Sequence, residues 1–235
     1  MKSFTVNSLR AGYGRKEVLC GIDMDIPVNR ISAIVGSNGC GKTTLLKCMA
    51  NILKPFAGIC RIDGKILSAI KQRDLAKRIA CCTQDHSDCS YFTVRELVKM
   101  GRYPYGNESA AVSEKAVSEA MQLVNLEEFA DCRLGELSYG TAHRAWLALA
   151  LAQQPELLLL DEPTNFLDPL KKQQLAQTLK YLKEEREVTV VMVTHDTEFI
   201  SDCADNVTAL KEGRVIRHGD AASVFTADAV SEIYS

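Results

Sequence analysis

The sequence predicts an α/β protein with a mixed, mainly parallel sheet, helices on both faces, an antiparallel β region before it and an inserted helical subdomain. Three observations predict this fold. A buried strand at 31–35 runs into a glycine-rich loop and a helix, a strand–helix–strand pattern follows over 157–194, and the stretch from 93 to about 154 is helical in pattern. We expect residues 1–235 to form one domain, with 86–154 as its helical subdomain.

Composition sets the broad class of protein. The chain has 235 residues, 46% hydrophobic and 25% charged, so it can bury one large core. A net charge of -2 gives no reason to expect a nucleic acid as partner. The longest apolar run, Ala145–Ala152, is far too short to span a bilayer, and the N-terminus has no secretory segment. The nine cysteines, with Cys81 and Cys82 adjacent, favour reduced thiols over disulfides.

The first elements are expected to be antiparallel strands. Phe4–Leu9 is one, and apolar alternation from Val18 to Ile26 indicates another, which ends at Pro27. Between them, Tyr13 is flanked by glycines. A tyrosine on such a turn usually faces solvent, but this one is close enough to the glycine-rich loop to contact what that loop binds.

The glycine-rich loop has a phosphate-binding pattern. Gly36–Thr43 fits G-x-x-x-x-G-K-[ST], between the strand at 31–35 and a helix expected over 44–50. Amides of such a loop and of the helix N-terminus converge on one anion. Lys42 is placed along the β- and γ-phosphates of a nucleotide, and the Thr43 hydroxyl on a bridging Mg²⁺ ion. The predicted nucleotide contacts of this P-loop NTPase core are Gly36, Ser37, Asn38, Gly39, Cys40, Gly41, Lys42, Thr43 and Thr44.

The elements that follow lead into the helical stretch. Ile59–Lys65 indicates a strand that ends in an Asp-Gly turn, and 79–83 indicates another short strand. Thr93 and Glu96 have the spacing of a capping box, which predicts a helix start, and Ser113 is expected to begin a longer helix.

A second site motif ends the apolar strand Leu157–Asp161. Its unbroken apolar character is typical of a central parallel strand, and a helix over 170–185 and a strand over 188–194 complete a β-α-β unit. Asp161 is placed to hold Mg²⁺, and Glu162 to polarise the attacking water. Two adjacent carboxylates beside a triphosphate indicate that both a metal and a general base are needed.

These ordered motifs resemble those of the ATP-binding subunits of ABC transporters over essentially the whole chain. The matching positions are Tyr13 for the aromatic residue on adenine, Gly36–Thr43 for Walker A, Gln84 for the glutamine that reaches Mg²⁺ and water, Leu137–Thr141 for the signature, Leu157–Glu162 for Walker B, Asn165–Asp168 for the loop across the dimer interface, and His195 for the switch histidine. The resemblance implies that the subunit binds ATP with Mg²⁺ and hydrolyses it.

The resemblance also implies partners and roles. Two copies close head to tail, so that Ser138 and Gly140 of one copy cover the γ-phosphate held by the other. The implied catalytic residues are Glu162, His195 and Gln84, and the implied metal ligands are Thr43, Gln84 and Asp161. Further implied partners are two integral membrane permease subunits and, indirectly, an extracytoplasmic substrate-binding protein, but no nucleic acid. The implied location is cytoplasmic, peripheral on the inner face of the cell membrane.

A narrower likeness concerns the cargo. Val94–Val98, Met100–Pro104 and Arg144–Trp146 resemble the corresponding parts of ATPases that serve importers of ferric siderophores, haem and cobalamin. Import of zinc or manganese is an alternative. Two other classes remain open: a soluble ABC ATPase that does not act in transport, and a nucleotide-binding scaffold with weakened catalysis.

The chain departs from the family pattern in its signature. Tyr139 and Thr141 stand where the family has glycine and glutamine, and a tyrosine brings a Cβ and a ring to a place of close backbone approach. We therefore expect slower dimer closure and turnover. Within the phosphate loop, Cys40 is either a thiol with a lowered pKa or simply a small residue that the turn tolerates. His143, after the signature, is expected at the surface.

Aromatic residues near the expected permease groove have two interpretations. They either supply aromatic surface to the membrane subunits or pack the helical subdomain itself. The residues concerned are Tyr91, Phe92, Tyr103 and Tyr105.

Overall fold

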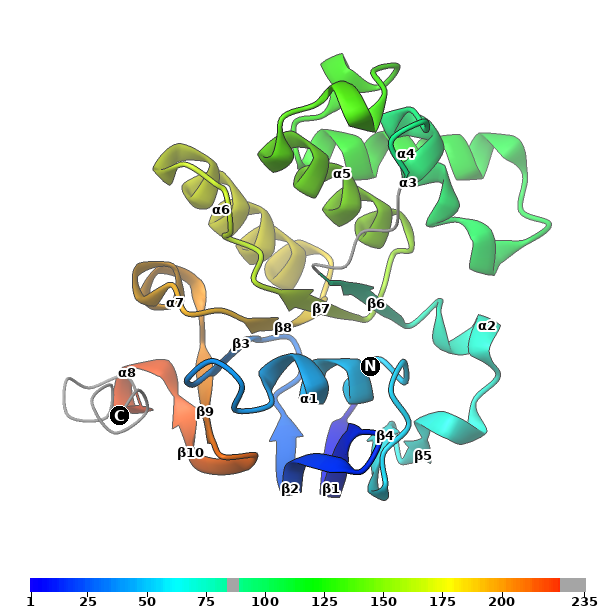
Figure 1. The fold of residues 1–235 in the computed structure, drawn as a ribbon. Helices are drawn as coiled ribbons and strands as arrows, with labels where there is room; N and C mark the ends of the chain where they lie inside the picture. The colour runs from blue at the N-terminus through cyan, green and yellow to red at the C-terminus, as the bar shows by residue number, and fades with distance from the viewer. Residues whose placement is uncertain (84–88, 225–235) are drawn as a thin grey trace.

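Two β-sheets and a group of helices make up the fold in this computed structural model, which describes residues 1–83 and 89–224 (Figure 1). The first sheet is antiparallel, in the order β2-β1-β4-β5. Its strands are β1 (Phe4–Tyr13), β2 (Lys16–Ile26), β4 (Ala57–Ile62) and β5 (Lys65–Ile66).

The second sheet has six strands in the order β10-β9-β3-β8-β7-β6, and every neighbouring pair is parallel except β9 and β10. This confirms the predicted mainly parallel sheet. Its strands are β3 (Ile31–Val35), β6 (Ile79–Cys82), β7 (Leu157–Asp161), β8 (Thr189–Val193), β9 (Asn206–Lys211) and β10 (Arg214–Asp220).

Helices cover both faces of the second sheet. One face packs on α1, with the antiparallel sheet beyond it, and the other packs on the remaining long helices (Figure 1). The helices are α1 (Lys42–Met49), α2 (Gln72–Leu75), α3 (Val94–Met100), α4 (Ala110–Leu123), α5 (Tyr139–Ala152), α6 (Pro169–Glu185), α7 (Thr197–Cys203) and α8 (Ala221–Val224). Helices α3, α4 and α5 gather on one side of the sheet, in the region expected to be helical; the limits 86–154 of a subdomain stay a prediction.

Several predicted element limits are corrected. The strand expected over Phe4–Leu9 continues to Tyr13, because β1 pairs with β2 as far as Tyr13. The expected strand Ile59–Lys65 is two strands, one on each side of a turn at Asp63 and Gly64. The long helix begins at Ala110 and not at Ser113, since the Ser109 hydroxyl caps it by accepting from the amide of Val112.

The capping box predicted at Thr93 is confirmed. The Thr93 hydroxyl accepts from the Glu96 amide at 3.2 Å, and the Glu96 carboxylate accepts from the Thr93 amide at 2.8 Å. These bonds satisfy amides that have no partner within the helix.

The prediction that His143 lies at the surface is wrong. It is buried in α5, since this helix packs against α3, α4 and β6. Within 1–83 and 89–224, none of the helices has the length and apolar character needed to cross a bilayer. All nine cysteines are described, and no disulfide joins any of them.

Candidate active site

The phosphate loop connects β3 to α1 at the carboxyl edge of the parallel sheet. Gly36 follows the last residue of β3 with a φ of 150°, and a Cβ on it would lie 2.2 Å from the carbonyl oxygen of Leu210. Only glycine therefore allows the loop to pass so close to β9. The loop ends at Gly41, directly before the first turn of α1.

The loop borders a cavity of about 780 Å³. Most of the predicted nucleotide contacts line it, together with both carboxylates after β7 and the histidine after β8. The lining residues are Tyr13, Val18, Gly36, Ser37, Asn38, Gly39, Gly41, Lys42, Thr43, Thr44, Asp161, Glu162, Asn165, Val193 and His195. Segments far apart in the sequence thus converge on one volume large enough for a nucleotide.

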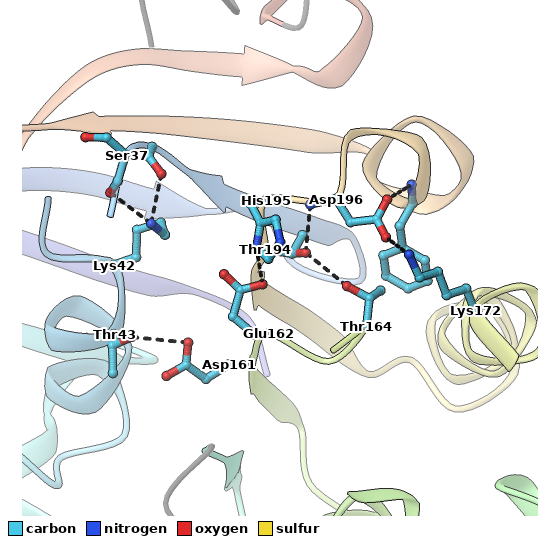
Figure 2. A network of polar contacts seen from close by, with 12 residues as sticks. Ser37, Lys42, Thr43, Asp161, Glu162, Thr164, Lys172, Thr194, His195 and Asp196 are labelled. Atoms are coloured by element: carbon cyan, nitrogen blue, oxygen red, sulfur yellow. Dashed lines mark hydrogen bonds and ion pairs between the residues drawn. The ribbon is translucent and has the colours of Figure 1, made fainter. Parts of the chain in front are cut away.

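Lys42 and Thr43 make the inner contacts of this cavity. The Lys42 ammonium donates to the carbonyl oxygens of Gly36 and Ser37 at 2.8 and 3.0 Å (Figure 2). The Thr43 hydroxyl donates to the Asp161 carboxylate at 3.2 Å. Burial raises the pKa of Asp161 even though that hydrogen bond favours the ionised form. A cation bound beside this carboxylate would favour its ionised form.

Glu162 and His195 form the second polar pair. The Glu162 carboxylate lies 2.9 Å from Nδ1 of His195 (Figure 2). The Glu162 amide donates to the carbonyl oxygen of Val193 at 2.8 Å. Glu162 has a φ of 51°, so the chain turns sharply at the end of β7. The turn aims its carboxylate toward β8 and the phosphate loop.

A chain of polar contacts holds the segment around His195. The hydroxyls of Thr164 and Thr194 lie 3.3 Å apart, and the Asp196 amide donates to the Thr194 hydroxyl at 3.1 Å. Asp196 also forms an ion pair with Lys172 of α6 (Figure 2). His195 is therefore flanked by fixed residues.

Ser138 and Gly140 do not line this cavity, and their role toward a second copy stays a prediction. The Ser138 hydroxyl caps α5 by accepting from the Thr141 amide at 3.2 Å, and lies 2.8 Å from the Thr141 hydroxyl. Gln84 lies outside the described residues.

The hypothesis of a lowered thiol pKa at Cys40 is wrong. The thiol is buried against Gly36, and burial raises its pKa even though Lys42 opposes the shift. The alternative, a small side chain within the turn, fits the structure. Three cavity residues, Val18, Asn165 and Val193, were missing from the predicted contacts. Asn165 was instead assigned to the loop across the dimer interface, and Val18 and Val193 were interpreted only as parts of strands.

A phosphate loop after a parallel strand, with paired carboxylates after a neighbouring strand, defines a P-loop nucleoside triphosphatase. The family described as ABC transporter matches residues 19–165. The chain is also 35% identical over 238 residues to the probable siderophore transport system ATP-binding protein YusV of Bacillus subtilis (strain 168), covering 100% of this chain and 86% of that protein. The chain therefore belongs to the ABC transporter family. It binds and hydrolyses ATP as an ATP-binding subunit of that family.

Further comparisons agree on this family. The ferric enterobactin transport ATP-binding protein FepC of Escherichia coli (strain K12) is 34% identical over 229 residues, covering 96% of this chain and 84% of that protein. Among solved structures, cbiO1 from Clostridium perfringens superposes with a TM-score of 0.83 at 31% identity, covering 97% of this chain and 92% of that chain. The dimeric bacterial ABC transporter cassette MJ0796 has a TM-score of 0.84 at 28% identity, covering 93% of this chain and 98% of that chain.

Proposed function

We propose that this chain is the ATPase subunit of an importer for a ferric siderophore, haem or another metal chelate. One observation carries the proposal: residues proposed to bind a triphosphate and residues proposed to hydrolyse it line a single cavity. Relatives named for transport of siderophores and ferric enterobactin support the cargo class. Closure of two copies on ATP would drive the movement of membrane permease subunits.

The proposed reaction uses four side chains. Lys42 leaves its two loop carbonyls and binds the β- and γ-phosphates, where its charge offsets the negative charge of the phosphates. Glu162 accepts a proton from water as the water oxygen bonds to the γ-phosphorus and the bond to the β,γ-bridging oxygen breaks. His195, which contacts Glu162 here, donates to the γ-phosphate. Tyr13, about half exposed at the cavity edge, stacks on the base.

The site suits a Mg²⁺ ion. The hydroxyl of Thr43 and the carboxylate of Asp161 are hard oxygen donors only 3.2 Å apart, and Mg²⁺ prefers such ligands. Gln84 is a third proposed ligand. When bound with ATP, the ion would neutralise charge on the β- and γ-phosphates.

The proposed partners are a second copy and two permease subunits. The second copy would bring Ser138 and Gly140 to the open side of the cavity. For the permeases, Tyr91 and Tyr103 are 81% and 83% exposed, which favours a docking role. Tyr105 instead packs within the helical region, since its hydroxyl donates to the Gln153 carbonyl oxygen at 2.7 Å. An extracytoplasmic substrate-binding protein and a location on the cytoplasmic face of the membrane complete the proposal.

Glu162→Gln tests the proposed chemistry. The amide cannot accept the proton of the attacking water, so kcat should fall at least about 100-fold while MgATP binding changes less than about threefold. Phosphate release and equilibrium nucleotide binding measure the two effects. Glu198→Gln, at an exposed acid in α7, is the matched control and should behave as wild type. Full turnover by Glu162→Gln would remove Glu162 from the role of base.

Transport is tested with the membrane subunits. The tagged chain should co-purify with integral membrane proteins, and vesicles holding that complex should take up a ferric siderophore only with ATP. Hydrolysis without membrane partners would favour a soluble ATPase that does not act in transport. Bound MgATP without phosphate release would favour a nucleotide-binding scaffold.

A further inference from the structure

The side chains of Tyr139 and Phe166 contact each other across two segments of the site. Tyr139 is the first residue of α5, and Phe166 lies in the loop 163–168 that follows Glu162. Their ring centroids are 4.2 Å apart and their planes are tilted by 58°. Rings whose centroids lie this close are in direct van der Waals contact. Both rings nevertheless stay open to solvent, since Tyr139 is 54% and Phe166 is 69% exposed.

The backbone of the loop maintains this contact at a cost. Phe166 has a φ of 64°, a left-handed conformation that costs a residue other than glycine roughly 1 kcal/mol or more. Its carbonyl oxygen packs on Gly140, where a Cβ would lie 3.1 Å from that oxygen. Because the Phe166 ring is mostly exposed, burial of apolar surface does not offset the cost. The arrangement therefore calls for a role outside the core.

In the proposed dimer, the Tyr139 ring would lie close to the bound nucleotide, and the contact with Phe166 would control where the ring lies. Ser138 and Gly140 must approach a phosphate held by a second copy, and the Tyr139 ring is attached between them. A freely rotating ring there would sweep the space in front of α5 and obstruct the phosphate. The contact with Phe166 restricts the ring to the side of the loop 163–168. The amides of Tyr139 and Gly140, which have no acceptor within the helix, then stay accessible to an anion, whereas the Thr141 amide donates to the Ser138 hydroxyl.

We propose that Phe166 is a positioning residue, which holds the Tyr139 ring aside and so keeps the N-terminus of α5 open to the nucleotide of a second copy. This inference rests on the proposed head-to-tail dimer. It explains how a signature with tyrosine in place of glycine stays competent. Phe166 acts through Tyr139 alone, so its effect depends on the tyrosine being present.

A double-mutant cycle in the full chain tests the dependence. The kcat values of wild type, Phe166→Ala, Tyr139→Gly and the double variant are compared first. ATP-induced dimerisation is then measured by sedimentation in the same four chains, each with Glu162→Gln added. Phe166→Ala alone should lower both quantities about three- to tenfold, which is the worth of one aromatic pair. In the Tyr139→Gly background the same change should have an effect below about twofold. Phe166→Tyr keeps a ring and should restore activity.

Leu170→Ala is the matched control, because Leu170 is an equally exposed apolar side chain in the first turn of α6. It should leave kcat and dimerisation at the wild-type level. Equal losses from Phe166→Ala in both backgrounds would overturn the inference and leave the proposed function standing. A wild-type chain that neither hydrolyses ATP nor dimerises with it would overturn the proposed function, and the inference with it.

Discussion

In the proposed head-to-tail dimer, two side chains in the first turn of α5 would set how closely a second copy can approach. Tyr139 carries a ring where the family has glycine, and Thr141, where the family has glutamine, is buried and bonded to Ser138. Even when Phe166 holds the ring aside, the Cβ of Tyr139 stays at the position of closest approach. A residual cost to dimer closure is therefore expected.

Replacing both residues should measure that cost. Tyr139→Gly with Thr141→Gln is expected to raise kcat about two- to tenfold, because glycine permits closer backbone approach to the phosphate. Steady-state phosphate release is the measurement. Tyr139→Gly alone is the companion variant, since the buried site of Thr141 has little room for glutamine. Equal rates in the wild type and both variants would show that the altered signature carries no penalty.

The positions of site residues were predictable from sequence wherever local order determines them. The phosphate loop and the Asp161-Glu162 pair were found because strand, loop and helix follow one another without interruption. Cys40 and His143 were misjudged because their surroundings come from distant segments. Burial, which no local pattern reports, raises the Cys40 thiol pKa and encloses His143.

At the scale of elements, local signals predicted the presence of strands and helices better than their limits. The apolar strand at Leu157–Asp161 was predicted with its observed limits. The extension of β1 to Tyr13 was not, because it depends on pairing with β2. The contact between α5 and the loop 163–168 was equally hidden, since it joins residues 27 positions apart through a left-handed Phe166.

Arg102 ties the end of α5 to the segment after α3. Its guanidinium makes two hydrogen bonds to Glu108, at 2.8 and 2.6 Å, and one to the Ala152 carbonyl oxygen at 2.6 Å. Its side chain is only 4% exposed. Glu108 has a lowered pKa because of the Arg102 hydrogen bond, in agreement with a strong pair.

Arg102→Ala should therefore lower the free energy of unfolding by roughly 3–5 kcal/mol, because it removes the cation that neutralises Glu108 and the donor to the Ala152 carbonyl oxygen. Urea titration followed by circular dichroism measures this change. Arg95→Ala breaks an exposed pair with Glu114 nearby and should cost below about 1 kcal/mol. Similar losses in the two variants would mean that Arg102 does not hold these elements together.

At the scale of the whole molecule, one cluster of charges joins the two sheets. Arg78, before β6, donates to Glu156, before β7, at 3.0 and 2.7 Å, and also pairs with Asp63 at the end of β4. The Asp63 carboxylate also accepts from the amides of Lys2 and Ser3. The cluster thus links the antiparallel sheet to the parallel one.

This cluster predicts a specific response to acid. Burial of Asp63 opposes ionisation, but the amides of Lys2 and Ser3 and the Arg78 guanidinium outweigh it and lower its pKa from 3.8 to about 2. A carboxyl with a lowered pKa in the folded state stabilises that state above its unfolded pKa. This stability, on the order of 2 kcal/mol, is lost as the pH falls from about 4 to about 2.

Asp63→Asn should accordingly be less stable than wild type at pH 7, and its stability should fall less steeply between about pH 4 and pH 2, since the amide has no proton to gain. Chemical unfolding at a series of pH values gives both quantities. Asp131→Asn, at an exposed carboxylate, serves as the control and should keep the wild-type slope. In the wild type, Asp63 must take up a proton when the protein unfolds at low pH, and this uptake makes stability depend on pH. An unchanged slope in Asp63→Asn would therefore mean that groups other than Asp63 cause the loss of stability in acid.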